Sequence, residues 1–421
     1  MITMNDKLKV LWFSNLAFSD IKHNGSGTWL HSMAEALVNT GAIQLFNITQ
    51  ARVKDATRQN SKSICQWLVP YESLSTYGLP SSKTIQEIQN IVDDIKPDII
   101  HIWGTECYWG LLTSRGYIKG NIILEIQGLK FAIEKYFYSG LSFLDILKCF
   151  GLKEILKPSV SLIGLKYFLK QWGKFEKEIL MNHKYISTQS DWVRVHIKNV
   201  NPMAQIFNTS IPLRTEFIVA NKWEVDSCLP YQVFTSTSSI MPYKGLHILL
   251  DAIAILNKRY PQIRLHIAGS NITGLREGGY SKWLKKKIKR LGIDPNVIWT
   301  GALDAKSLIM QIHKANVVVV PSFVESYCLA FDEALTVGAP TVASFAGAMP
   351  ELATHEKTAL FFSPGDVVMC ANAIERFFVD SDYAAKVSCN AYNEKKTKNN
   401  TNIALSQLTT YRKIMSVRLL T

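Results

Sequence analysis

Two glutamates near the end of the chain, in the stretch PSFVESYCLAFDEAL, have a spacing that suits a defined chemistry. Glu325 and Glu333 stand eight positions apart. The preceding residues, NVVVVPS, form a buried type of strand that ends at Pro321, whereas LAFDEALTVG has the apolar spacing of a helix. We therefore expect Glu325 in the loop that leaves the strand and Glu333 inside the helix.

This loop and helix could bind phosphate and sugar hydroxyls together. The N-terminus of a helix carries partial positive charge and free N–H groups, which suit a phosphate. Carboxylates beside it can accept hydrogen bonds from hydroxyl groups, and a nucleotide sugar offers a diphosphate between two sets of hydroxyls. The alternative is that Glu325 is an ordinary loop carboxylate and Glu333 an exposed helix residue.

Strands alternate with helices along most of the chain. One run extends from KVLWFSN through DIIHIW to NIILEIQG, and a second extends from YQVFTSTSS to PTVAS. Such alternation predicts parallel sheets with helices on both faces. We expect two Rossmann-like, doubly wound α/β domains that face each other across a cleft, with ligand at the carboxyl ends of the strands.

The predicted boundaries follow the change in pattern between the two runs. We assign residues 1–212 to the first domain, with a basic, aromatic, helical insert at about 130–180; residues 213–230 to a polar linker; residues 231–395 to the second domain; and residues 396–421 to a C-terminal helix that packs back on the first domain.

The composition excludes several other classes of protein. With 47% hydrophobic and 19% charged residues, the 421-residue chain has the balance of folded domains. No secretory signal and no run of about 18 apolar residues is visible, so we expect no membrane-spanning helix. Seven scattered cysteines without a C-x-x-C pair argue against disulfides or a zinc site and fit the cytosol. The net charge of +13 indicates an anionic partner.

The stretch VVVVPSFVESYCLAFDEALTVGAPTVASFAGAMPEL resembles the donor-binding region of the retaining GT-B glycosyltransferases of family 4. Their E-x7-E motif is matched by Glu325 and Glu333, and the resemblance extends through YKGLHILLDAIAIL, LHIAG and KPDIIHIWGTE. It implies that Glu333 binds the ribose hydroxyls and that Glu325 lies by the donor sugar. It further implies donor contacts from the following residues: Ser326, Tyr327, Cys328, Leu329 and Gly347.

Lys244, in YKGLH, matches the lysine that holds the donor diphosphate in this family. The ordinary alternative is a surface lysine. The family usually has an arginine five residues earlier, where this chain has Ser239. That departure removes a bidentate phosphate contact and leaves a catalytically inactive homologue, which binds a glycan or nucleotide sugar, as the rival hypothesis.

The first domain offers three further candidates for the acceptor and diphosphate. The loop of Gly25, Ser26 and Gly27 would let the backbone approach a ligand closely, although a tight turn requires no more than glycine. Glu106 could orient the acceptor hydroxyl or merely cap a strand end. Gln127 stands where many family members have a histidine, and it cannot take a proton at neutral pH.

The insert interleaves aromatic residues with many lysines. Such a segment either lies on an anionic membrane, where a lipid-linked acceptor would be found, or is an ordinary amphipathic helix with a solvated lysine face. No nucleic-acid-binding module is recognised, so no nucleic acid is expected. The resemblance implies an enzyme that needs no metal ion or cofactor and uses a UDP- or GDP-linked sugar as its substrate. It further implies a cytoplasmic protein that can contact the inner face of the membrane.

Overall fold

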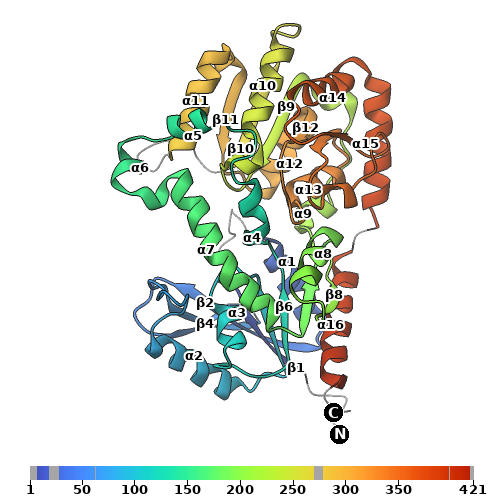
Figure 1. The fold of residues 1–421 in the computed structure, drawn as a ribbon. Coiled ribbons are helices and arrows are strands. Elements are labelled where there is room, and N and C mark those ends of the chain that lie inside the picture. The colour runs from blue at the N-terminus through green and yellow to red at the C-terminus, as the bar shows by residue number, and fades with distance from the viewer. Residues whose placement is uncertain (1–6, 19–27, 62, 270–277, 398, 418–421) are drawn as a thin grey trace.

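The computed structural model describes residues 7–18, 28–61, 63–269, 278–397 and 399–417, and its two α/β domains lie one above the other in Figure 1. Each domain contains one sheet, of eight strands in the N-terminal domain and six in the C-terminal domain. The prediction of two parallel-sheet domains is therefore confirmed.

The N-terminal sheet has the strand order β3-β4-β2-β1-β5-β6-β7-β8. Its strands are β1 (Leu8–Phe13), β2 (Ile43–Ala51), β3 (Thr57–Ser61), β4 (Ile64–Pro70), β5 (Ile99–Trp103), β6 (Ile122–Glu125), β7 (Tyr185–Thr188) and β8 (Gln205–Asn208). All neighbours pair in parallel except β3, which forms an antiparallel edge with β4. The helices around this sheet are α1 (Thr28–Asn39), α2 (Ser82–Ile95), α3 (Trp109–Ser114) and α8 (Asp191–Val200).

The C-terminal sheet is parallel throughout, in the order β11-β10-β9-β12-β13-β14. Its strands are β9 (Leu229–Thr237), β10 (Arg264–Gly269), β11 (Val297–Gly301), β12 (Ala315–Val320), β13 (Thr341–Ser344) and β14 (Leu360–Phe362). The helices are α10 (Leu246–Asn257), α11 (Gly279–Leu291), α12 (Ala305–Lys314), α13 (Leu329–Thr336), α14 (Val367–Val379) and α15 (Ser381–Lys395). Every residue of β12 is buried, as expected of a strand covered on both faces.

The segment between the sheets contains the short helix α9 (Thr215–Ile218) and the turn Val225–Ser227. After α15, the chain returns to the N-terminal domain as α16 (Asn400–Val417), which runs along that domain in Figure 1. Tyr411 of α16 is buried there, with its hydroxyl 2.7 Å from Nδ1 of His101 in β5. The last helix therefore completes the N-terminal core.

The insert joins the cores of both domains. It consists of α4 (Lys130–Ile133), α5 (Phe143–Lys148), α6 (Leu152–Leu156) and α7 (Leu162–Met181), with single helical turns at Glu134–Tyr136 and Pro158–Val160. Leu162, at the start of α7, is buried in the core of the C-terminal domain, whereas Ile179 and Leu180 near its end lie in the N-terminal core. Figure 1 shows α7 running from one domain to the other.

No helix within the described ranges has both the length and the apolar character needed to cross a membrane.

Candidate active site

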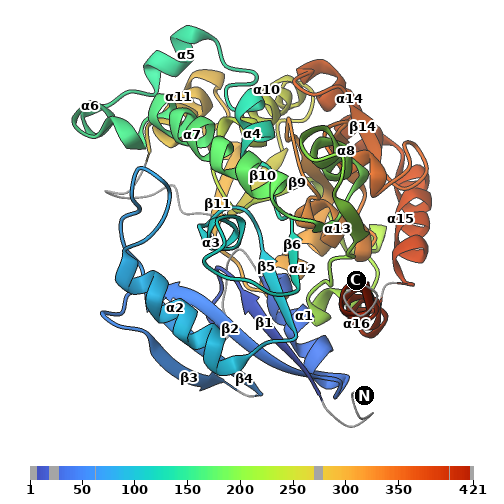
Figure 2. The ribbon, with the colours of Figure 1, turned by 60° about the horizontal axis from the view of Figure 1, so that its bottom comes forward.

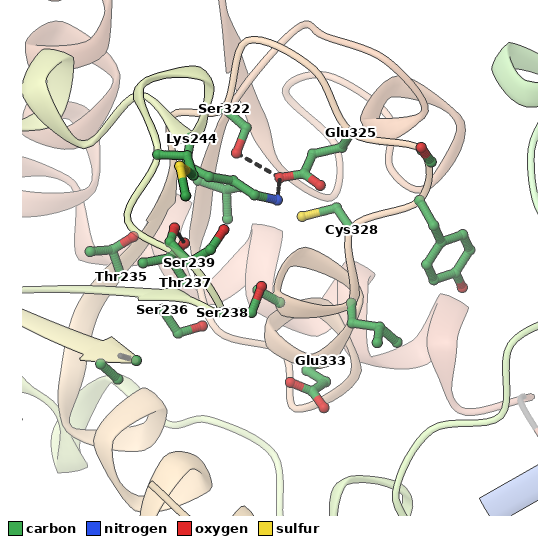
Figure 3. A pocket seen from close by; sticks show the side chains of 18 of the residues that line it. Thr235, Ser236, Thr237, Ser238, Ser239, Lys244, Ser322, Glu325, Cys328 and Glu333 are labelled. Carbon is green, nitrogen blue, oxygen red and sulfur yellow. Dashed lines mark hydrogen bonds and ion pairs between the residues drawn. The ribbon is translucent and has the colours of Figure 1, made fainter. Parts of the chain in front are cut away.

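A cavity of about 580 Å³ lies between the two domains, at the carboxyl ends of the strands. This volume is within the range of small-molecule sites, roughly 300–1,000 Å³. The N-terminal half of the chain contributes, among others, Trp29, Gln127 and Gln189 to its walls. The C-terminal domain contributes the loops after β9 and β12, shown in Figure 3.

One wall of the cavity is a run of hydroxyl residues at the end of β9. Five consecutive residues line the cavity: Thr235, Ser236, Thr237, Ser238 and Ser239. The Thr237 hydroxyl donates to the Ser239 carbonyl at 2.7 Å, which fixes the turn. Serine and threonine hydroxyls can both donate and accept hydrogen bonds, so this wall suits a polar ligand.

Lys244 and Glu325 form an ion pair in this cavity. Lys244 Nζ lies 2.7 Å from Glu325 Oε1, and the Ser322 hydroxyl donates to the same oxygen at 2.7 Å. The two ionic side chains are only 19% and 12% exposed. Burial by itself lowers the pKa of Lys244, but the attraction of Glu325 outweighs it, so the pKa is raised above its ordinary value. The lysine therefore remains charged at neutral pH and can approach an anion.

The glycine of the YKG sequence permits this pairing. Gly245 has φ +71°, and a Cβ there would lie 1.9 Å from the carbonyl oxygen of Pro321. Because no other residue tolerates that approach without movement, Gly245 lets the start of α10 lie against the end of β12. The Phe323 amide also donates to the Tyr243 carbonyl at 2.8 Å. This hydrogen bond joins the turn that contains Lys244 to the loop that contains Glu325, which we call the glutamate loop.

The loop between Glu325 and Glu333 ends at the N-terminus of α13. Ser326, Tyr327, Cys328 and Leu329 all line the cavity. The first amides of a helix have no intrahelical acceptor, so this end is suited to a phosphate. Cys328, which precedes the helix, has φ +90°, a left-handed conformation that favours glycine. The loop therefore has the backbone of a glycine turn without the glycine.

Glu333 lines the opposite end of the cavity from the Lys244–Glu325 pair, as Figure 3 shows. Arg214, from the segment between the domains, donates to Glu333 Oε1 through Nε at 3.0 Å and Nη2 at 2.6 Å. Burial raises the pKa of Glu333 to about 7, although Arg214 opposes the shift. Sequence reasoning missed Arg214 because it placed this residue in a polar linker.

The N-terminal side presents Gln127 to the cavity, with Glu106 just behind it. Gln127 is a lining residue, whereas Glu106 is not among the lining residues. A Cβ built at Gly104 would approach both the Glu106 carboxylate and the Gln127 amide carbon, so the two side chains are close neighbours. Burial raises the pKa of Glu106, and nearby Lys130 opposes that shift.

Two contacts connect the loops after β12 and β13 to the start of α8. The Ser190 hydroxyl donates to the Ser326 carbonyl at 2.8 Å. The Glu351 carboxylate accepts hydrogen bonds from the amides of Asp191 and Trp192 at 2.7 and 2.8 Å. A carboxylate at a helix N-terminus is favourably placed, so Glu351 joins the C-terminal domain to a helix of the other domain.

The part of the chain that carries this wall of the cavity matches a known family. Residues 222–394 match the family model of the glycosyl transferases group 1. The resemblance predicted from Glu325, Glu333 and their surroundings is thus confirmed at the level of group 1.

The curated relatives match over limited stretches. The chain is 29% identical over 154 residues to glycogen synthase from Mycobacterium tuberculosis, which covers 37% of this chain and 35% of the relative. It is 30% identical over 124 residues to mannosylfructose-phosphate synthase from Agrobacterium fabrum, with 29% and 27% covered. The chain thus aligns with about a third of the length of these relatives.

Solved structures match over nearly the whole chain and show the GT-B fold. Sucrose-phosphate synthase from Thermosynechococcus elongatus superposes with a TM-score of 0.73 at 19% identity, over 98% of this chain and 100% of that structure. HepE from Anabaena in complex with UDP-glucose superposes with a TM-score of 0.66 at 14% identity, over 96% and 100%.

Most of the site residues expected from the sequence meet at this cavity. Its lining includes the following members of the predicted set: Gln127, Ser239, Lys244, Glu325, Ser326, Tyr327, Cys328, Leu329 and Glu333. Gly25, Ser26 and Gly27 lie outside the described residues. Whether the lining residues contact a donor stays a prediction.

Gly347 lies behind the glutamate loop and is not among the residues that line this cavity. A Cβ at Gly347 would lie 2.1 Å from the Glu325 carbonyl oxygen, and the neighbouring Ala348 amide donates to that oxygen at 2.9 Å. Gly347 instead lines a smaller hollow of about 320 Å³ with Trp192, Phe323 and Phe345. In this arrangement it supports the backbone of Glu325.

Proposed function

We propose that the chain is a retaining glycosyltransferase of family 4 that transfers a sugar from a UDP- or GDP-linked donor to a glycan or lipid-linked acceptor. The observation that carries the proposal is the cavity itself, where the Lys244–Glu325 pair and Glu333 occupy opposite ends. The family match of residues 222–394 supports it, and so does the fold shared with HepE, whose structure is a complex with UDP-glucose.

In this proposal the donor spans the cavity. Glu333 accepts hydrogen bonds from the ribose hydroxyls, and the diphosphate lies at the N-terminus of α13 within reach of Lys244. Glu325 and its loop contact the transferred sugar. The hydroxyl wall from Thr235 to Ser239 takes the place of the arginine that the family usually has, and offers neutral hydrogen bonds in its stead.

The reaction breaks the bond between the anomeric carbon and the diphosphate oxygen. An acceptor hydroxyl forms the new bond on the same face of the sugar, and its proton passes to the departing diphosphate oxygen. Gln127 cannot act as a base at neutral pH, which fits a leaving group that takes the proton itself. Lys244 and the helix N-terminus, rather than a metal ion or other cofactor, stabilise the negative charge.

We place this activity in the assembly of a cell-surface polysaccharide, in the cytoplasm. The test measures release of nucleoside diphosphate from UDP- and GDP-sugars, with and without candidate acceptors, for the wild type and Glu325→Gln. Acceptor-dependent release that the substitution abolishes supports the proposal.

The rival is a catalytically inactive homologue that binds glycan or nucleotide sugar, and Ser239 favours it because serine replaces the phosphate-binding arginine that the family usually has at this position. Nucleotide binding shifts the thermal unfolding midpoint, since a ligand at about 100 times its Kd stabilises the folded state by roughly 2.7 kcal/mol. A midpoint shift with UDP or GDP that Glu333→Ala abolishes, without release of diphosphate from any donor and acceptor pair, would establish the rival.

A further inference from the structure

Helices α5 and α6 expose an unusual amount of apolar surface. Six large apolar side chains within residues 143–156 are between 46% and 83% exposed: Phe143, Leu144, Leu147, Leu152, Ile155 and Leu156. We call these six the α5–α6 edge. Isolated exposed apolar residues are normal on a protein, but contiguous exposed apolar patches mark sites of interaction.

The apolar surface continues onto the first half of α7. Ile163, Tyr167 and Phe168 are 50%, 63% and 51% exposed. Ile163 and Tyr167, four residues apart, lie on the same side of the helix, and Phe168 follows Tyr167 directly. The exposed apolar surface thus runs over three successive helices of the insert.

Buried residues and hydrogen bonds anchor helices α5 and α6 to the rest of the protein. Ile146 and Cys149 are buried, and the Ser142 hydroxyl accepts from the Asp145 amide to cap α5. The Glu154 carboxylate accepts from the amides of Gly151 at 3.0 Å and of Gly279, the first residue of α11, at 2.9 Å. The outward direction of the edge residues is therefore set by anchored helices.

Helix α11, which is in contact with α5, carries a high positive charge. Its sequence, GYSKWLKKKIKRL, contains six cationic residues and no acidic residue. Lys282, Lys286 and Lys289 are exposed, as are Lys148 and Lys157 beside the edge. Helices α5 and α11 are in contact, and both views show α5, α6 and α11 side by side (Figures 1 and 2).

The acidic residues beside the edge, Asp145 and Glu154, form hydrogen bonds within the protein. Asp145 accepts hydrogen bonds from the amide and hydroxyl of Ser142, and Glu154 is buried against backbone amides. The exposed charge around the apolar side chains is therefore mainly positive. An apolar surface bordered by lysines complements a bilayer that carries anionic headgroups.

We propose that the α5–α6 edge inserts into the interface of an anionic lipid bilayer, with the lysines of α11 in contact with the headgroups. The insert reaches from this edge to the cavity, because Ile133 of α4 lines the cavity. The membrane contact would bring a lipid-linked acceptor beside the site, and in that respect it rests on the proposed function.

The experiment mixes the full chain with vesicles of phosphatidylcholine alone or of phosphatidylcholine with phosphatidylglycerol, and measures co-sedimentation. The wild type should bind the anionic vesicles at least about tenfold more than the neutral ones, and salt should weaken the binding. Leu152→Glu/Leu156→Glu should reduce binding about tenfold or more. A matched control, Val368→Glu/Val379→Glu, places the same charges on exposed positions of α14 and should bind as the wild type does.

Several results would overturn the proposal. Absence of vesicle binding by the wild type is one, and equal binding by wild type and Leu152→Glu/Leu156→Glu is another. A wild type that is dimeric in gel filtration, with a monomeric Leu152→Glu/Leu156→Glu variant and no vesicle binding, would make the edge an interface between copies of the chain. Glu325→Gln should bind vesicles normally, so vesicle binding is tested apart from sugar transfer.

Discussion

Buried carboxylates in the two domains have different partners. On the C-terminal side of the cavity, Glu325 is paired with Lys244 and Glu333 with Arg214. Each carboxylate there has a cation within 2.7 Å. These cations are charged groups that a diphosphate or a ribose could share, because lysine and arginine have several donors each.

In the N-terminal domain, Glu125 and Glu176 instead accept hydrogen bonds from neutral groups. Glu176 accepts from the Thr105 hydroxyl at 2.5 Å and from the Phe131 amide at 2.9 Å. Glu125 accepts from the Gln189 amide at 3.3 Å. Burial raises the pKa to about 8 for Glu125 and about 7 for Glu176. The comparison indicates a charged wall on the C-terminal side of the cavity, and two acids of the N-terminal interior, Glu125 and Glu176, that serve as hydrogen-bonding groups.

Removing Lys244 should have the largest effect on the charged wall. We expect Lys244→Ala to reduce release of nucleoside diphosphate by about 100-fold or more, because the leaving group loses its nearest cation. Steady-state kinetics with a UDP- or GDP-sugar measures it. Lys258→Ala, at an exposed position directly after α10, is the matched control. Activity of Lys244→Ala within a few fold of wild type would contradict a role in transfer.

Removing Arg214 should break the second ion pair and leave Glu333 without its cation. The expected loss of stability is about 2 kcal/mol, since one partner of a buried pair is removed. Thermal unfolding should show a midpoint lower by about 5 °C for Arg214→Ala. The double variant Arg214→Ala/Glu333→Gln should recover part of this loss. A double variant as unstable as the sum of both changes would show that the pair contributes nothing.

The buried acids of the N-terminal interior should make the stability of the protein depend on pH. Because the folded pKa of Glu125, about 8, lies above its ordinary value of 4.5, the folded state binds more protons than the unfolded state between these values. The protonated Glu125 therefore stabilises the folded state at low pH. This contribution to the free energy of unfolding is lost as the pH rises, by at most about 1.4 kcal/mol per pH unit. The contribution of Glu125 to the free energy of unfolding should therefore fall between about pH 5 and about pH 8.

Glu125→Gln removes this titration while keeping the shape of the side chain. Its unfolding midpoint should fall less than that of the wild type over the same range. Parallel curves for the two proteins would mean that Glu125 is ionised at neutral pH in the folded state, and the contrast between the domains would disappear.

The smallest expected effect concerns the backbone of the loop between Glu325 and Glu333. Cys328→Gly should be more stable than Cys328→Ala by about 1 kcal/mol, because φ +90° strains alanine but not glycine. Chemical unfolding of the two variants measures the difference. The reverse order would show that the left-handed conformation at Cys328 costs nothing in this loop.

Much of the donor side could be predicted from the sequence because its residues lie at the ends of regular elements. Glu325 and Lys244 lie in loops that follow strands and Glu333 lies within a helix, and the apolar patterns of these elements are clear, so their meeting place follows from the fold. Arg214 could not be found in this way, since its role depends on how the linker folds over the second domain. Gly347 was expected at the donor, but the structure places it behind Glu325, because two loops approach closely there.

The insert shows a different limit of prediction. Its helices are amphipathic in the sequence, but no local pattern indicates which domain receives the buried face. The structure places Phe137, Cys149 and Leu162 in the core of the C-terminal domain, although they precede its first strand by many residues.

This arrangement has a consequence for the order in which the protein is made. Synthesis proceeds from the N-terminus, so Phe137, Cys149 and Leu162 leave the ribosome before any strand of the sheet that will bury them. Their apolar side chains cannot be buried in that core until the strands of the second domain have been synthesised. These side chains are therefore transiently exposed during synthesis, and transiently exposed apolar surface is prone to aggregation.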